Sequence, residues 1–358
     1  MVMIRQARIE RVQSLLEETG LDGCVLKGMD NIFYLTGFRG SEGSLFITRG
    51  DVVLVVDFRY VTHAREVTRD IRIEEMRPKR DVINDLCTKY RISKLGFDGA
   101  HVHYNVFKSW AENLVGISLV PMNNAIEEIR KTKEPEEITA IMAAIEAATK
   151  AFTDVLGLVK PGSTEKEIAD ELDHAMRKRG AQGPSFDTIV VSGPRGALPH
   201  AEPGDRKLKE GETVIIDYGA AVAGYCSDET VTVCLGEIPD KLSEIYAIVN
   251  DARKLGIEKA RAGMAIARLD AIVRGYIEER GYGDFFRHGV GHGVGIAVHE
   301  APGINSVANG ILEENMVITV EPGIYLPNIG GVRLEDMVLI TEDSPRVLTH
   351  IRKDIIKM

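Results

Sequence analysis

The sequence predicts two domains, an α/β domain followed by an α+β domain, and three observations lead to that prediction. First, 358 residues exceed the roughly 100–200 residues usual for one domain. Second, the first third of the chain alternates short apolar runs with helical patterns, as an α/β layer domain does. Third, strand-like runs dominate from residue 186 onward, with two helical patterns among them.

The first domain is expected over residues 1–125. Residues 5–19 predict a helix, because apolar side chains fall on one face and Gly20 ends it. Short apolar runs and further helical patterns follow. The runs predict strands at 24–26, 32–35, 45–48 and 52–56, and the patterns predict helices at 81–90 and 104–114.

The second domain is expected over residues 126–358, with the boundary inside 122–132, where the chain becomes highly charged. Pro135 suits the first turn of a long helix that runs to about residue 158. Thr164 and Glu167 form a capping-box pattern that predicts the start of the next helix. Two more helices are expected near 242–262 and 266–280.

Composition limits the classes of function. A formal net charge of -10 argues against a nucleic-acid partner, because no basic field attracts phosphates. The first residues lack the apolar run of a signal peptide, and no stretch approaches the roughly 20 apolar residues of a membrane span. We therefore expect a soluble cytoplasmic protein. Its four separated cysteines form no CxxC pair and are expected to be reduced and buried: Cys24, Cys87, Cys226 and Cys234.

A hairpin in the second domain is expected to bring two carboxylates together. Strand-like runs flank a small-residue turn at 220–224, and a turn centred between Val222 and Ala223 sets Asp217 directly opposite Asp228. Facing side chains in such a pair lie about 4.5–5.5 Å apart. Two carboxylates so close on apolar strands repel each other unless a proton or a cation lies between them.

The C-terminal region repeats this arrangement. Its turn is expected at 327–331, and a centre at Asn328 sets Glu321 opposite Glu335. His292 supplies a nitrogen ligand, since glycines on both sides let backbone and metal approach closely. Four carboxylates and one imidazole suit manganese, cobalt, iron or zinc, and their charge balances two divalent cations. Two such ions roughly 3.5–4 Å apart activate a bridging water for hydrolysis.

These segments resemble the metallopeptidase family of the pita-bread fold, which contains methionine aminopeptidases, Xaa-Pro aminopeptidases, Xaa-Pro dipeptidases (prolidases) and the metal-free creatinases. The run Asn31-Ile-Phe-Tyr-Leu-Thr-Gly-Phe is similar to the N-terminal domain of the Xaa-Pro branch, which methionine aminopeptidases lack. The resemblance covers essentially the whole chain. It implies five metal ligands, the second and last of which bridge two ions: Asp217, Asp228, His292, Glu321 and Glu335.

The resemblance also implies roles for residues around the ligand set. His200 is expected to bind the substrate, and His299 to hydrogen-bond the scissile carbonyl oxygen and stabilise the oxyanion that develops there. Glu321 is expected to add proton transfer, from the bridging water to the leaving proline nitrogen, to its role as ligand. Arg333 lies on the strand face of the last ligand and is expected to support a ligand carboxylate or the substrate. His288 is expected either to line the cleft or to shield it.

Two positions depart from the family pattern and bear on specificity. Val231 and Gly303 each occupy a position where relatives often carry arginine. A dipeptidase must hold the free carboxylate of its substrate's proline, which arginine does with two hydrogen bonds. No arginine occurs between residues 288 and 332. This pattern favours an aminopeptidase acting on longer peptides, although Arg333 or a residue of another subunit could hold the carboxylate.

We therefore predict a two-metal Xaa-Pro aminopeptidase, a homodimer by resemblance, that cleaves peptides with proline at the second position. Manganese is the expected metal, with cobalt or zinc as alternatives. An Xaa-Pro dipeptidase is the main alternative function. A catalytically inactive module that binds a peptide or protein, and a metal-free creatinase-like chemistry, are disfavoured by the complete set of ligands.

Overall fold

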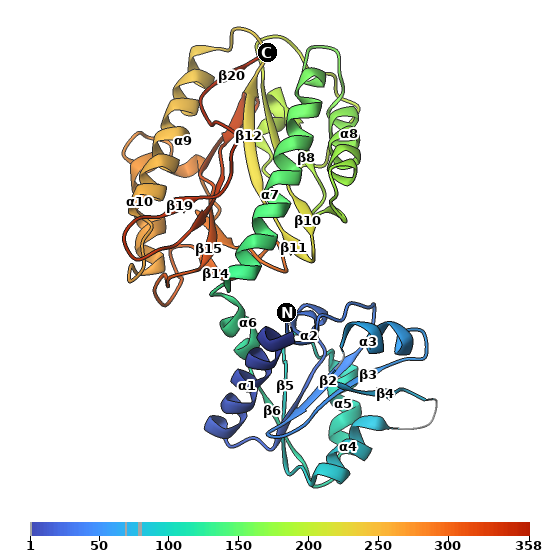
Figure 1. Ribbon diagram of the computed structural model, residues 1–358. Coiled ribbons are helices and arrows are strands. Elements are labelled where there is room, and N and C mark those ends of the chain that lie inside the picture. Colours follow the sequence, from blue (N-terminus) through green and yellow to red (C-terminus); the bar gives the residue numbers. More distant parts are fainter. Residues whose placement is uncertain (1, 69, 78–80) are drawn as a thin grey trace. The chain divides into compact units, whose positions relative to one another are not determined.

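The computed structural model describes residues 2–68, 70–77 and 81–358. The chain divides into two compact units, Met1–Arg130 and Lys131–Met358 (Figure 1). The division falls after Arg130, inside the expected boundary range of 122–132, because helix α6 (Ala125–Arg130) is held by the first unit. The Arg130 guanidinium donates to Asn31 Oδ1 at 2.8 Å, and Asn31 in turn donates to Glu127 Oε1 at 2.7 Å.

The first unit is a mixed six-stranded sheet with the strand order β4-β3-β2-β1-β5-β6. Strand β2 is antiparallel to both of its neighbours, and the other pairs are parallel. The predicted α/β class is therefore confirmed. The strands are β1 (Gly23–Leu26), β2 (Ser44–Thr48), β3 (Val52–Val56), β4 (Arg72–Glu75), β5 (Lys94–Phe97) and β6 (Ser118–Pro121). The helices before α6 are α1 (Val2–Thr19), α2 (Met29–Thr36), α3 (Val61–Val67), α4 (Val82–Tyr90) and α5 (Tyr104–Asn113).

One predicted strand of this unit is wrong, because residues 32–35 belong to helix α2. Four apolar residues are too few for their periodicity to separate a strand from a buried helix. The helix ends at Gly37, whose φ of 76° is left-handed and whose N–H donates to the carbonyl of Phe33. Ile32 and Leu35 are fully buried, so packing fixes this segment as a helix.

The second unit carries helices on two flanks of its strands, with α7 and α8 on one flank and α9 and α10 on the other (Figure 1). A four-stranded sheet with the order β20-β12-β9-β8 packs against α7 (Pro135–Val155) and α8 (Glu165–Lys178). A five-stranded sheet with the order β14-β13-β15-β18-β19 packs against α9 (Asp240–Lys259) and α10 (Ile266–Glu278). The predicted α+β class is confirmed by this arrangement.

The elements of the second unit that lie between or after these helices are short. The strands are β7 (Gly183–Pro184), β8 (Ile189–Ser192), β9 (Thr213–Tyr218), β10 (Ala220–Val222), β11 (Tyr225–Cys226), β12 (Glu229–Cys234), β13 (Gly291–Gly293), β14 (Glu300–Ile304), β15 (Val317–Val320), β16 (Gly323–Leu326), β17 (Gly330–Arg333), β18 (Asp336–Leu339), β19 (Arg346–Val347) and β20 (Ile356–Lys357). Three short 3-10 helices are η1 (Leu156–Leu158), η2 (Gly193–Ala197) and η3 (Gly283–Phe285).

Two sequence predictions about local structure are confirmed here. Thr164 caps α8, since its hydroxyl accepts from the Glu167 N–H at 3.1 Å while the Glu167 carboxylate accepts from the Thr164 N–H at 2.8 Å. All four cysteines are free and buried.

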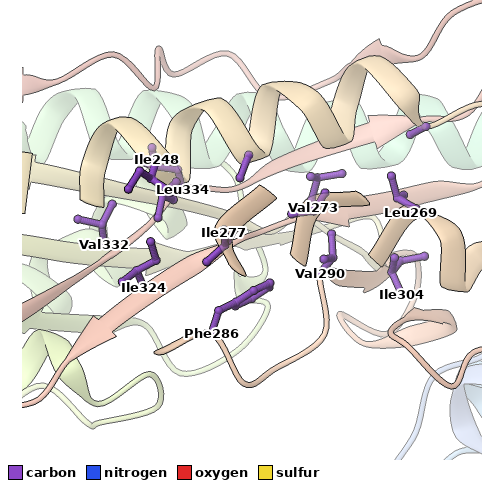
Figure 2. Packing of buried hydrophobic residues seen from close by; sticks show 14 of the residues in the cluster. Ile248, Leu269, Val273, Ile277, Phe286, Val290, Ile304, Ile324, Val332 and Leu334 are labelled. Carbon is purple, nitrogen blue, oxygen red and sulfur yellow. The ribbon is translucent and has the colours of Figure 1, made fainter. Parts of the chain in front are cut away.

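A large apolar core holds α10 against the strands that lead into the site. Figure 2 shows Leu269, Val273 and Ile277 gathered with Val290 and Ile304. The three helical residues recur every fourth position, so they share one face of α10, and all three are fully buried. Burying each such side chain contributes about 1.5–3 kcal/mol. The strand ends that carry the site therefore rest on a rigid support.

Candidate metal centre

The five predicted ligands lie at strand ends of two different sheets. Asp217 is on β9 and Asp228 directly precedes β12, both in the four-stranded sheet. In the five-stranded sheet, His292 is on β13, Glu321 directly follows β15 and Glu335 directly precedes β18. All five side chains line one cavity of about 490 Å³. Two sheets must therefore meet for the set to exist.

The predicted register of the first hairpin is wrong by two residues. Asp217 lies opposite Thr230 rather than opposite Asp228. The turn is centred between Ala223 and Gly224, whose φ values of 50° and 85° are both positive, as a type I′ turn requires. A shift of two residues preserves the face on which each side chain lies. Both carboxylates therefore still point into the same cavity.

The predicted register of the second hairpin is confirmed. Strands β16 and β17 pair around Asn328, and β15 and β18 continue the same register beyond a short break. Glu321 and Glu335 lie in that break. The pair Val320 and Asp336 lies on one side of it, and the pair Gly323 and Arg333 lies on the other side. Because neither belongs to a ladder, their side chains are free to turn inward to the cavity.

His292 is positioned to bind a metal ion through a ring nitrogen. Its Nδ1 lies 3.0 Å from the Gly293 carbonyl, so Nδ1 carries the proton and Nε2 keeps its lone pair. Nε2 lies 3.5 Å from Asp228 Oδ2 and 3.4 Å from Glu321 Oε1. Burial lowers the pKa of His292 to about 4, so the ring is neutral at pH 7.

The glycines beside His292 are required by close backbone contacts. A Cβ at Gly291 would lie 2.1 Å from the Thr319 carbonyl oxygen, and a Cβ at Gly293 would lie 2.2 Å from that of Ala301. Both distances are far inside van der Waals contact, so only glycine fits at either position. The glycines let three strands approach around the histidine.

A hydroxyl group holds one oxygen of Glu335, and a guanidinium group holds one oxygen of Asp217. Thr230 Oγ1 donates to Glu335 Oε2 at 2.6 Å, and Arg333 Nη2 donates to Asp217 Oδ2 at 2.6 Å. The other oxygens, Asp217 Oδ1 and Glu335 Oε1, are buried with no hydrogen-bond partner among the described residues. An unpaired buried carboxylate oxygen costs free energy. These two oxygens are placed to bind a cation.

The electrostatics of the cavity also favour cations. Burial, followed by the charges of Glu335 and Asp217, raises the pKa of Asp228 well above its ordinary value. Burial likewise raises the pKa of Glu335 well above its ordinary value and that of Glu321 to about 8. One ligand atom each of Asp228, His292 and Glu335 lie within 4.8 Å of one another, a grouping that can hold a metal ion. Four carboxylates and a neutral imidazole thus fit divalent cations, since such ions relieve the repulsion.

A buried chain of polar groups runs beside the ligands. Arg333 is 3% exposed and contacts the Tyr325 hydroxyl at 3.1 Å and the Pro199 carbonyl at 3.2 Å, besides its bond to Asp217. The Tyr325 hydroxyl lies 2.9 Å from His288 Nε2. Burial, together with the charge of Arg333, lowers the pKa of His288 to about 4. Arg333 is thus committed to a ligand carboxylate, and His288 lines the cavity as a neutral ring.

The two remaining predicted residues, His200 and His299, line the same cavity and are exposed. The His299 ring lies 4.3 Å from the His292 ring, centroid to centroid, in an edge arrangement. Both histidines therefore face the space where a substrate would bind. Their catalytic roles stay predictions.

Sequence reasoning missed the residues that orient the ligands. Thr230 donates to Glu335, and the Thr319 hydroxyl accepts from the His292 N–H at 3.0 Å. Thr230 lies two positions after Asp228 and Thr319 two positions before Glu321, so strand alternation could have placed each on the face of a candidate ligand. Asn305 and Asp187 also line the cavity from loops, where no periodic signal exists. Val231, in contrast, packs into the core beneath α7 and α8 and does not line the cavity.

A cavity that gathers four carboxylates and a neutral imidazole at the junction of two sheets is a centre of the metal-dependent hydrolase class. The sequence agrees: residues 139–342 match metallopeptidase family M24, and residues 8–132 match the creatinase/prolidase N-terminal domain. The chain belongs to metallopeptidase family M24, whose catalytic domain has the pita-bread fold, and it is a hydrolase of the Xaa-Pro peptidase group. The peptidases of this family depend on two metal ions.

Individual relatives agree over the whole chain. It is 39% identical to an uncharacterized peptidase of Bacillus subtilis, YqhT, covering 98% of this chain and 99% of that protein. The structure is similar to an Xaa-Pro dipeptidase from Bacillus anthracis, with a TM-score of 0.94, 37% identity and coverage of 99% and 100%. It is also similar to an X-Pro aminopeptidase from Thermotoga maritima, with a TM-score of 0.91, 35% identity and coverage of 98% and 99%. Within the described residues, no helix has the length and apolar character that crossing a membrane requires.

Binding of manganese to the metal-free protein at pH 7 is predicted to release protons. The pKa of Glu321 rises from the ordinary 4.5 to about 8, so the metal-free site holds protons that a divalent cation displaces. Calorimetric titration in two buffers of different ionisation enthalpy measures this proton release. Manganese binding without a change in bound protons would contradict this picture.

For the same reason, the metal-free protein is predicted to lose stability as pH rises from 4.5 toward 8, since ionising these carboxyls costs more in the folded state.

Proposed function

We propose that the chain is a two-metal Xaa-Pro aminopeptidase, which removes the N-terminal residue from peptides with proline at the second position. The proposal rests on one observation in particular: of the residues that line the metal cavity, the single arginine is Arg333. Its guanidinium is already bonded to Asp217, Tyr325 and the Pro199 carbonyl. The metal cavity thus offers no uncommitted guanidinium for the carboxylate of a dipeptide. Arg287 lines the neighbouring cavity but not the metal cavity, and its Nε donates to the Asp284 carbonyl at 2.8 Å.

The space next to the metal cavity supports a longer substrate. A second cavity of about 650 Å³ shares four lining residues with the first, namely Pro199, His200, His288 and Tyr325. A peptide that continues beyond proline has room to extend there.

The ligand set would hold two divalent ions through Asp217, Asp228, His292, Glu321 and Glu335, with Asp228 and Glu335 shared. Manganese is the proposed metal, with cobalt or zinc as alternatives, because oxygen-rich sites with one imidazole suit these ions. When bound, such ions polarise the scissile carbonyl and supply an acidified water. The homodimer and the cytoplasmic location stay predictions.

Side chains of the protein supply oxyanion stabilisation, substrate binding, proton transfer and ligand orientation. His299 donates a hydrogen bond to the carbonyl oxygen as negative charge develops on it, an interaction worth about 3 kcal/mol for comparable donors. His200 binds the substrate from the cavity wall. Glu321 would take a proton from the attacking water at its carboxylate and deliver that proton to the leaving proline nitrogen. Arg333 keeps Asp217 oriented by the 2.6 Å bond between them.

An Xaa-Pro dipeptidase remains the second candidate, because one of the similar structures is an Xaa-Pro dipeptidase and another an X-Pro aminopeptidase. A peptide panel separates the two functions. We predict that tripeptides with proline second are cleaved with a kcat/KM at least about tenfold above that of the matching dipeptides, since a dipeptide leaves its carboxylate unpaired. The panel varies the first residue and the length, and each peptide is assayed with manganese, cobalt and zinc. Efficient cleavage of dipeptides with no cleavage of tripeptides would establish the dipeptidase instead.

The substitution Glu321→Gln is predicted to lower kcat by about 10²–10⁴, the usual loss when a general acid–base group is removed. Metal content is measured on the same samples, because glutamine also weakens ligation. Glu314→Gln is the matched control, since Glu314 is an exposed glutamate of the same unit outside the cavity. A Glu321→Gln enzyme that retains both metals and near-full turnover would exclude the proton transfer.

A further inference from the structure

The residues directly after two candidate ligands carry carboxylates that point away from the cavity. Strand alternation places Glu229 on the face opposite Asp228, and Asp336 on the face opposite Glu335. Glu229 and Asp336 are each 2% exposed, and neither lines the metal cavity. A second group of buried acids therefore lies behind the metal site.

These two buried acids belong to different sheets. Glu229 opens β12 of the four-stranded sheet, and Asp336 opens β18 of the five-stranded sheet. Asp228 and Glu335, the two ligands proposed to contact both ions, therefore have a spacing that depends on the distance between the two sheets. On the cavity side, that distance is set by Thr230 and Glu335: the Glu335 N–H donates to the Thr230 carbonyl at 3.1 Å, besides the hydroxyl bond at 2.6 Å.

On the far side, one lysine contacts both acids. Lys353 Nζ forms an ion pair with Glu229 Oε1 and lies 3.8 Å from Asp336 Oδ1. The Lys353 side chain is 1% exposed, so water does not screen its charge. The same ammonium donates to the Ile351 carbonyl at 3.2 Å, and Tyr246 Oη donates to the Lys353 carbonyl at 3.4 Å. The C-terminal segment is therefore fixed where its ammonium spans the two sheets.

Further partners complete the far-side group and neutralise it. Arg253 of α9 pairs with Asp336 Oδ2, and Thr349 Oγ1 donates to Asp336 Oδ1 at 2.6 Å. Tyr218 Oη donates to Glu229 Oε2 at 3.2 Å. The carboxylates of Glu229 and Asp336 balance the cations of Lys353 and Arg253. Of the two cations, Lys353 is the one within 4 Å of both acids.

We propose that Lys353 is a positioning residue for the metal centre: its ammonium ties the strand that carries Asp228 to the strand that carries Glu335, and so sets the spacing of the two shared carboxylates. This inference rests on the proposed ligand roles of Asp228 and Glu335. A lysine that only stabilised the fold would leave metal affinity unchanged once the fold is restored. Groups that hold metal ligands from outside change that affinity, typically 10–100-fold.

The test uses a double variant, Lys353→Met with Glu229→Gln. Lys353→Met alone leaves Glu229 buried without its cation, which destabilises a fold strongly, whereas the double variant removes both charges and keeps the pair between Asp336 and Arg253. Circular dichroism and thermal unfolding confirm that the variant folds. We expect manganese titration to show the weaker of two binding steps reduced by about 10–100-fold. We also expect the spin coupling between two manganese ions, seen by electron paramagnetic resonance, to disappear at metal concentrations that fill the unmodified enzyme.

The matched control is Arg195→Met with Glu165→Gln. This pair is also buried at its carboxylate, with a separation of 2.9 Å, but it joins α8 to η2 rather than the two ligand strands. The control is expected to lose stability and keep both manganese affinities. Unchanged manganese affinities in the Lys353 double variant, or an equal loss in the control, would overturn the positioning role. An unmodified enzyme that binds no manganese would instead overturn the proposed function, and the inference with it.

Discussion

Repulsion among buried carboxylates is the constraint on which the catalytic unit depends. Asp217, Asp228, Glu321 and Glu335 line one cavity, and burial together with mutual repulsion opposes ionisation of three of them. Surrounding groups satisfy one oxygen of Asp217 and one of Glu335 and leave the second oxygen unpaired. The arrangement costs stability without cations and becomes favourable with them, so binding of divalent ions is expected to stabilise the catalytic unit.

The junction of two sheets is what makes such a site possible. Each sheet packs against its own pair of helices in a largely separate apolar core. The ligands divide between them, two on one sheet and three on the other. Contacts across the junction join the two sets of candidate ligands: Thr230 with Glu335 on the cavity side, and Lys353 with two acids on the far side. The buried cation Arg333 adds a contact from β17, in the separate two-stranded sheet of β16 and β17, to Asp217 on β9.

Much of this could be predicted from the sequence, and the failures have physical causes. The centre at Asn328 gives the correct pairing because the turn residues are distinctive, whereas the first turn is misplaced because Ala223 carries no signal for its positive φ. The prediction that Asp217 and Asp228 point into one cavity is still correct, since a two-residue shift keeps each side chain on its face of the sheet. Residues 32–35 form a helix because packing overrides a short apolar pattern. The junction of the two sheets, with Lys353 on the side away from the cavity, joins residues more than a hundred positions apart. No local sequence pattern predicts such a contact.

The most direct measurement is anomalous X-ray diffraction from crystals grown with excess manganese. The account predicts two manganese peaks roughly 3.5–4 Å apart, enclosed by Asp217, Asp228, His292, Glu321 and Glu335, with Asp228 and Glu335 touching both ions. Crystals that show no manganese between these side chains, or a single ion with the unpaired oxygens of Asp217 and Glu335 turned elsewhere, would contradict it.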